Sequence, residues 1–164
     1  MMLVREFSPD DSLQALTDML HRAYSALGKM GLNYTAVDQS VEITADRIRY
    51  GHCFVTIEGM TLVGTITVNP THQQSDCAHF RASGVASANQ LAVEPALQSR
   101  GIGSALLHHA ESWAFAQGFK ELALDTAEPA VYLVEFYRRR GYRLVERVQW
   151  PGKTYRSVVL SKVV

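Results

Sequence analysis

The residues of this chain that are best suited to chemistry lie at one short turn, where a strand is expected to end and a helix to begin. Residues 98–103 read QSRGIG. Gly101 and Gly103 let a ligand approach the backbone without a Cβ in the way. Free N–H groups in the first helical turn and the helix dipole favour a phosphate or diphosphate, and Arg100 adds a positive charge. Glycines at such a turn also serve tight packing alone, and that alternative stays open.

Two familiar phosphate-binding motifs do not fit this turn. The P-loop requires a Lys and then a Ser or Thr directly after its last glycine, whereas Gly103 is followed by Ser104 and Ala105. The dinucleotide fingerprint requires a third glycine where this chain has Leu106, and no strand–helix–strand unit starts the chain. General nucleotide-phosphate binding therefore rests on the glycine turn alone.

The turn closely resembles the Q/R-x-x-G-x-G/A motif of the GNAT superfamily, the Gcn5-related N-acetyltransferases. Residues 91–107, LAVEPALQSRGIGSALL, look like the core signature of that family, and residues 136–143, FYRRRGYR, look like its later signature. The resemblance implies an acetyl-CoA-dependent N-acetyltransferase that acetylates a primary amine of a small molecule or peptide by direct attack in a ternary complex. A non-catalytic acyl-CoA-binding or sensing module is the alternative.

The resemblance also implies where acetyl-CoA binds. Backbone groups of the strand that ends at Val93 bond the pantetheine arm, and the amides of the turn hold the diphosphate. The implied coenzyme-binding residues are Leu91, Ala92, Val93, Gln98, Ser99, Arg100, Gly101, Ile102, Gly103 and Ser104. That strand and the strand at 121–126 would splay apart, which leaves a slot where the thioester meets the amine.

Tyr137 is the predicted catalytic residue, because by resemblance it matches a tyrosine that lies near the sulfur of CoA. An unperturbed phenol titrates near ~10 and a thiol near ~8.5, so a neutral tyrosine can protonate the departing thiolate. The alternative is a tyrosine that only fills the groove beside the coenzyme.

The general base is not fixed by the sequence. Some relatives carry a Glu on the strand before the core signature, but residues 83–93, SGVASANQLAV, contain no carboxylate. The proton of the amine can leave through a water chain that ends on a backbone carbonyl or on Gln90, or it can pass to Asp125 or Glu128. Many relatives carry an Asn at the start of the last helix, where this chain reads TAEPA, and this change places Glu128 where it can face the slot.

Several other polar residues each have a functional and a structural interpretation. Residues 138–140 are three arginines that can contact the adenosine phosphate of the coenzyme, although arginines at a helix carboxyl end are also favoured by the dipole. By resemblance, four further residues lie near the acceptor entrance or serve packing: Asn33, Tyr34, Trp150 and Tyr155. The lack of a clear acidic cluster disfavours a polycationic acceptor such as a polyamine.

Neither metal nor disulfide chemistry is expected. Cys53 and Cys77 lie in segments that match no disulfide framework and no CxxC motif, so both should be free thiols. His72, Cys77 and His79 are close in sequence, but no fourth ligand stands at a regular spacing, so no metal is expected.

The elements that must position these residues follow from periodicity, caps and turns. Helices are predicted over 8–28, 40–50, 102–118 and 130–140, with loops at 28–38 and 70–84. Strands are predicted over 3–7, 52–57, 62–68, 86–93, 121–126, 142–150 and 154–163. The fold class is therefore α+β: a mixed, mostly antiparallel sheet of six to seven strands with about four helices, similar to the GNAT acyltransferase fold.

Composition limits which classes of protein and of binding partner remain possible. The 164 residues suit one domain over 1–164, and 47% apolar residues supply a core. Sixteen basic residues balance sixteen acidic ones, so no global field recruits nucleic acid or an anionic membrane, and a local basic patch stays open. No apolar run of about 18 residues appears, and we expect a soluble, cytoplasmic protein. Homodimers are common in the family, which makes a homodimer one expectation.

Overall fold

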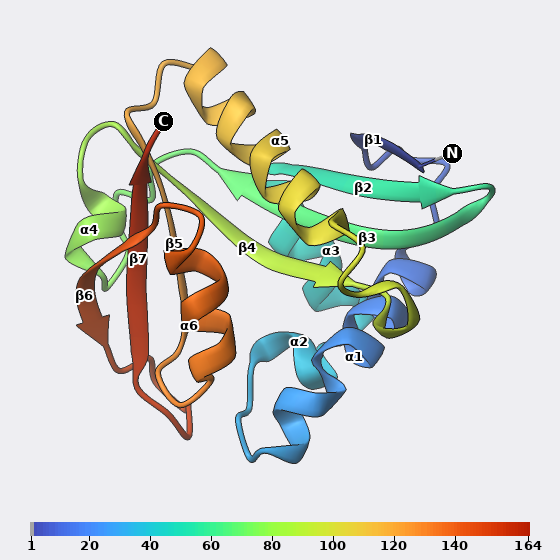
Figure 1. Ribbon diagram of the computed structural model, residues 1–164, viewed down its shortest axis with the longest axis horizontal. Coiled ribbons are helices and arrows are strands. Elements are labelled where there is room, and N and C mark those ends of the chain that lie inside the picture. Colours follow the sequence, from blue (N-terminus) through green and yellow to red (C-terminus); the bar gives the residue numbers. More distant parts are fainter. Residues whose placement is uncertain (1) are drawn as a thin grey trace.

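The computed structural model describes residues 2–164 as one seven-stranded sheet, in the order β1-β2-β3-β4-β5-β7-β6, with helices on both faces (Figure 1). The strands are β1 (Met2–Glu6), β2 (His52–Glu58), β3 (Thr61–Asn69), β4 (Val85–Val93), β5 (Glu121–Ala127), β6 (Arg143–Val148) and β7 (Ser157–Val163). The helices are α1 (Leu13–Lys29), α2 (Thr35–Asp38), α3 (Val41–Arg49), α4 (Ala78–Arg81), α5 (Ile102–Ala116) and α6 (Val131–Arg138), with a 3-10 turn at Pro95–Leu97. None of the helices described is both long and apolar enough to span a bilayer.

The two faces of the sheet are covered by different helices, because side chains alternate along each strand. On β2, Phe54 belongs to the large core beneath α5, together with Ile66 and Leu106. Its neighbours Cys53 and Val55 point the other way and pack against α1. The predicted mixed, mostly antiparallel sheet is confirmed, since β4 and β5 are the one parallel pair described.

The sheet opens in its middle, between β4 and β5. These strands pair from Val85 opposite Glu121 to Ser87 opposite Ala123, and the pairing stops there. Two residues of β4, Gln90 and Leu91, stand opposite one residue of β3, so β4 carries a bulge, and Gln90 takes a left-handed φ of 56°. The splayed slot implied by the resemblance is thus present, and the bulge lies at its edge.

The first helix begins later than predicted, at Ser12 rather than Ser8. The Ser12 hydroxyl accepts a hydrogen bond from the N–H of Ala15 at 3.0 Å. Asp11 instead accepts from the N–H of Ser8 at 2.7 Å and from both terminal nitrogens of Arg5 at 2.7 and 2.9 Å. These bonds hold residues 8–11 in a turn, so the Ser8–Pro9 cap pattern is not used.

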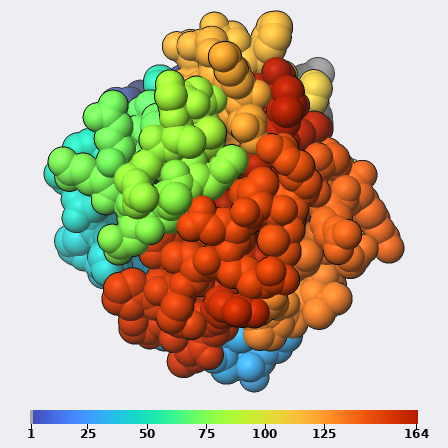
Figure 2. Space-filling model, turned by 90° about the vertical axis from the view of Figure 1, so that its left-hand side faces the viewer, coloured from blue at the N-terminus to red at the C-terminus, as the bar shows by residue number. Residues whose placement is uncertain are grey.

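Both predicted loops contain a short helix, which brings the number of α helices described to six rather than about four. Within 28–38 lies α2, and within 70–84 lies α4. The first N–H groups of α4, from Ala78 and His79, donate to the carboxylate of Glu146 on β6. Figure 2 shows the segment around α4, in green, against the red strands of the carboxyl-terminal hairpin. A partner distant in sequence supplies this cap, so local spacing did not predict it.

Gly64 on β3 allows the start of α5 to lie close to the sheet. A Cβ at this position would stand 3.0 Å from Leu106 Cδ1 and 3.1 Å from Ile102 Cγ2, which is tighter than ordinary van der Waals contact. The absence of a side chain there sets the position of the glycine turn that precedes α5.

Candidate functional site

A cavity of about 830 Å³ occupies the opening between β4 and β5. Its walls come from four stretches of the chain, within residues 23–47, 88–104, 124–140 and 150–155, together with Ile66. This volume falls in the range of sites that bind cofactors and small molecules. The cavity therefore gathers segments that are far apart in sequence around the splayed strands.

The glycine turn presents unpaired backbone donors to this cavity. Within residues 2–164, the N–H groups of residues 99–104 donate no hydrogen bond, and the first bond of α5 runs from the N–H of Ala105 to the carbonyl of Gly101 at 3.0 Å. Ser99 and Gly101 both have left-handed backbones, with φ of 66° and 84°. Alternation of backbone handedness turns successive N–H groups toward one side, the geometry of an anion-binding nest.

Arg140 brings a positive charge to the same place. Its Nε and Nη2 atoms donate to the Ser104 hydroxyl at 2.9 and 2.6 Å, and the guanidinium lies 3.6 Å from the centre of the Phe136 ring. A cation beside the positive end of a helix dipole is unfavourable unless an anion joins them. No carboxylate in the described chain forms an ion pair with Arg140. The arrangement is therefore suited to a phosphate-bearing ligand.

Nine of the ten predicted coenzyme-binding residues line the cavity, and Arg100 is the exception. Arg100 is exposed and does not line the cavity, whereas Arg140, one of the three consecutive arginines, does. The Gln98 side chain folds back and donates to the carbonyl of Val93 at 3.3 Å. The structure thus separates the cation that faces the site from the one that the motif suggested.

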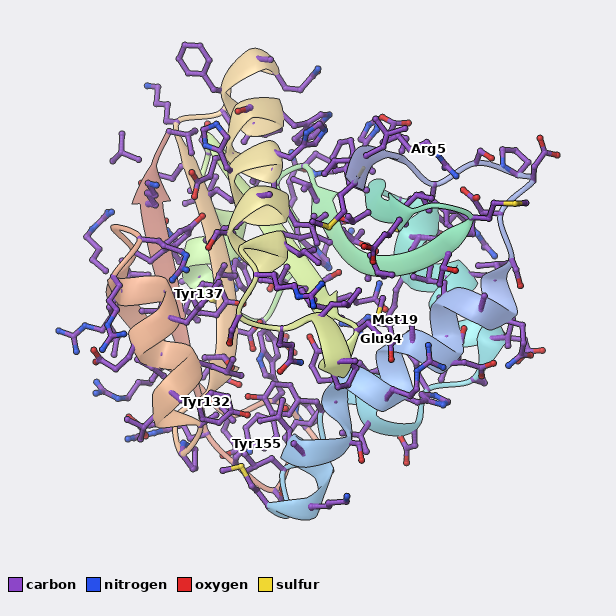
Figure 3. All side chains as sticks on the ribbon, turned by 45° about the vertical axis from the view of Figure 1, so that its right-hand side comes forward. Arg5, Met19, Glu94, Tyr132, Tyr137 and Tyr155 are labelled. Atoms are coloured by element: carbon purple, nitrogen blue, oxygen red, sulfur yellow. The ribbon has the colours of Figure 1, made fainter. Side chains whose placement is uncertain are left out.

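Tyr137 lies on α6 with its ring packed inside the molecule and on the wall of the cavity. The ring meets Phe136 and Tyr142 edge-on, with centroids 5.2 and 5.9 Å away. Its hydroxyl has no hydrogen-bond partner among the residues described. Burial raises the pKa of Tyr137 well above its usual range, so the phenol stays protonated. Figure 3 shows Tyr132 and Tyr137 along α6, with Tyr155 near the end of α1.

The two carboxylates suggested by the sequence have different positions. Asp125 lines the cavity and accepts a hydrogen bond from the Trp150 indole at 2.9 Å. Burial raises the pKa of Asp125, although the bond from Trp150 opposes this effect. Glu128 lies outside, bound to Arg147 and Arg156 at 2.8 Å each, and these partners lower its pKa. The expectation that Glu128 faces the slot is therefore wrong.

Gln90, the third candidate, lines the cavity near the bulge, but its side-chain amide is engaged. Its Oε1 accepts from Gln39 at 2.8 Å, and its Nε2 donates to the Thr67 hydroxyl at 3.3 Å. An amide whose oxygen and nitrogen are both hydrogen-bonded is better suited to orienting its neighbours than to accepting a proton from the amine.

An aromatic wall closes the end of the cavity away from the glycine turn. The Tyr34 ring lies 5.6 Å from that of Tyr24 and 5.1 Å from that of Tyr155. The Tyr24 hydroxyl donates to the carbonyl of Leu91 on the bulged part of β4 at 2.9 Å. Tyr34, Trp150 and Tyr155 therefore line the same cavity as the predicted coenzyme-binding residues.

Asn33 does not line the cavity. Its side chain instead ties two loops together, because Nδ2 donates to the carbonyl of Gly152 and Oδ1 accepts from the N–H of Thr154, both at 2.9 Å. Four titratable lining residues were not predicted from the sequence: Tyr24, Arg47, Tyr132 and Lys153. Tyr24 was assigned only to the apolar stripe of its helix, and no motif marks the other three.

Comparison with known proteins agrees with this geometry. The chain is 28% identical over 151 residues to the S-(2-succino)cysteine N-acetyltransferase of Bacillus subtilis, covering 91% of this chain and 88% of the relative. The ribosomal-protein-S18-alanine N-acetyltransferase of Escherichia coli has a similar fold, with a TM-score of 0.77 at 15% identity over 100% of this chain and 94% of that one. A GNAT family acetyltransferase of Elizabethkingia anophelis, solved with acetyl-CoA bound, has a TM-score of 0.71 at 15% identity over 99% and 98%.

The family model described as acetyltransferase (GNAT) family matches residues 13–142, which include α1, the bulged strand, the glycine turn and Tyr137. This match and the curated relative together confirm the predicted enzyme class. The chain belongs to the acetyltransferase (GNAT) family and is an N-acetyltransferase that uses acetyl-CoA as its acetyl donor.

Proposed function

We propose that residues 99–104 hold the diphosphate of acetyl-CoA, and that the acetyl group passes directly to a primary amine bound at the aromatic end of the cavity. The observation that carries this proposal is the row of N–H groups without acceptors at the start of α5, next to the unpaired charge of Arg140. Backbone N–H groups at a helix start bind phosphate without particular side chains. The strand residues 91–93 then guide the pantetheine arm into the slot.

We assign the two proton transfers of the reaction to two side chains. The nitrogen–carbon bond forms as the amine attacks the thioester carbon, and the carbon–sulfur bond breaks. Asp125 takes the proton that the amine loses, directly or through water, because it is the one carboxylate on the cavity wall described. Tyr137 gives its hydroxyl proton to the departing sulfur, and solvent afterwards restores both groups.

Direct transfer is favoured over a covalent acetyl-enzyme. Neither Cys53 nor Cys77 lines the cavity; both are free and buried, and burial raises the pKa of each thiol. A buried neutral thiol is a poor nucleophile. Alignment of amine and thioester in one slot supplies an orientation effect large enough to account for much of the rate.

The acceptor is proposed to be a small molecule. The aromatic wall and the loop that carries Lys153 enclose the acceptor end, which leaves a space suited to a compact amine. The Bacillus subtilis relative is named for S-(2-succino)cysteine, and its alignment spans 91% of this chain, so this compound is the first acceptor to assay.

Two measurements on the purified chain test the proposal. Acetyl-CoA and CoA should raise the melting temperature in proportion to their binding, while ATP should not, because it lacks the pantetheine arm. Release of free CoA from acetyl-CoA should then depend on an added amine, with the N-acetylated amine as the product by mass spectrometry. Equal stabilisation by ATP and acetyl-CoA would contradict the assigned site, and loss of acetyl-CoA without an N-acetyl product would contradict the assigned transfer.

A further inference from the structure

Two cations at the acceptor end of the cavity have no carboxylate partner. Arg47 on α3 and Lys153 in the loop between β6 and β7 both line the wall, and neither forms a salt bridge anywhere in residues 2–164. On the same helix, the exposed Arg49 pairs with Asp46 at 2.8 Å. Arg47 and Lys153 thus leave positive charge on the cavity wall that no salt bridge neutralises.

A buried amide network holds Arg47 in place. Its Nη1 donates to Gln39 Oε1 at 2.8 Å. Gln39 is only 2% exposed, and its Nε2 donates to Thr44 Oγ1 and to Gln90 Oε1 at 2.8 Å each. One of the five guanidinium donors is used, which leaves the planar fork available for a carboxylate. Burial lowers the pKa of Arg47, a sign that its charge is incompletely solvated.

Two hydrogen bonds hold the Lys153 side chain in place. Its Nζ donates to the carbonyl of Asn33 at 2.8 Å and to Thr35 Oγ1 at 3.0 Å, so one of its three donors stays free. Burial and then the nearby charge of Arg47 lower the pKa of Lys153. Two cations held within each other's field repel, and an anionic ligand between them would relieve that repulsion.

The same cavity offers two acceptors for an ammonium group. Asp125 is the one acidic residue on the wall described, and Asn89 Oδ1 is buried without a hydrogen-bond partner. Two cations therefore stand near one carboxylate and one unpaired amide oxygen. A polyamine would meet the wrong sign of charge, whereas a compound that carries both an amine and carboxylates would meet complementary charges at both ends.

We infer that Arg47 and Lys153 form a carboxylate-binding subsite, and that the acceptors are amino acids whose carboxylates pair with these cations while the amine faces Asp125 and Asn89. The inference rests on the proposed function, because it assigns the acceptor class of the same cavity. Two cations favour a dicarboxylic amino acid over a monocarboxylic one, and either over a plain amine.

Three acceptors on one scaffold test this order: S-carboxymethylcysteine with two carboxylates, S-methylcysteine with one, and 2-(methylthio)ethylamine with none. At saturating acetyl-CoA, kcat/KM should fall on the order of tenfold with each carboxylate lost, as expected for loss of a charge-assisted pair. Arg47→Gln and Lys153→Gln should raise KM for the two amino acids and leave KM for the plain amine unchanged. Arg49→Gln, an exposed change on the same helix, is the matched control and should preserve the order.

The ratio between acceptors does not depend on how much of a variant is folded, so partial unfolding cannot imitate the result. Equal kcat/KM on the three acceptors, or losses of the same size on all three in Arg47→Gln, would overturn the subsite while acetyl transfer stood. If none of the three is acetylated, calorimetry with the CoA complex decides. Binding of S-carboxymethylcysteine that weakens in Arg47→Gln supports the inference, and no binding overturns it. Failure of acetyl-CoA itself to bind would refute the proposed function instead.

Discussion

Replacement of Tyr137 by Phe separates catalysis from folding in this protein. The Tyr137 hydroxyl has no hydrogen-bond partner among residues 2–164, so its removal should change the free energy of unfolding by less than about 0.5 kcal/mol. Burial keeps the pKa of the phenol above its usual range, so the proton that it would donate is present across the neutral pH range. Loss of a positioned general acid slows the reaction on the order of 10²–10⁴-fold, or about 2.7–5.4 kcal/mol in the barrier.

Tyr142→Phe is the matched control, because the ring of Tyr142 packs edge-on against Tyr137 and its hydroxyl has the opposite role. That hydroxyl donates to Glu111 Oε2 at 2.8 Å, and loss of a hydrogen bond to a charged group costs about 1.5–3 kcal/mol. Tyr137→Phe should therefore keep its stability in urea unfolding and lose rate of acetylation at saturating acetyl-CoA. Tyr142→Phe should lose stability and keep its rate. A Tyr137→Phe enzyme with a rate within a few-fold of the parent would refute the proton-donor role.

Three further changes test other parts of the site and fold. Gly101→Ala should lose about 1–2 kcal/mol in urea unfolding, because the backbone there has a φ of 84°; a KM for acetyl-CoA that does not rise would argue against diphosphate binding at this turn. Asp125→Asn should remove the acid limb of the kcat/KM profile, since the pKa of Asp125 is raised by burial and a base works only above its pKa. An unchanged acid limb would exclude Asp125 as the base. Asp11→Asn should lower the melting temperature at neutral pH, because the hydrogen bonds from Arg5 lower the pKa of Asp11 to about 2 from 3.8. This stabilisation is present above the ordinary pKa and is lost as pH falls through about 2, so a difference that persists in strong acid would contradict it.

The donor half of the site could be predicted from the sequence because its chemistry is local. A strand end, two glycines and a helix start are contiguous between Val93 and Ser104, and that order alone leaves N–H groups without partners. Tyr137 was found through a second contiguous signature. Arg100 is local to the turn, but its side chain is exposed and does not line the cavity, whereas Arg140, in the turn that follows α6, does.

Elements whose ends depend on distant partners were not predictable in the same way. Ser8 and Ser12 both satisfy the pattern of a helix cap, and the Arg5–Asp11 pair selects the second. Helix α4 is capped by Glu146, 67 residues further along the chain. Gly64 shows no motif in its own strand, and its importance follows only from the Ile102 and Leu106 side chains that lie over it.

The acceptor half of the site is built from residues far apart in the chain, and sequence patterns do not reveal such an arrangement. Arg47 and Lys153 come from a short helix and a loop near the other end of the chain, and each alone fits an ordinary solvated cation. They meet because the β4–β5 pairing stops at Ser87 and the β6–β7 loop reaches back to Asn33. Under the proposed function, acetyl-CoA is bound largely through backbone groups that many sequences can supply, while the amine is selected by side chains that only the completed sheet brings together. Substitutions at Arg47 or Lys153 should therefore change which amine is acetylated and leave the binding of acetyl-CoA intact.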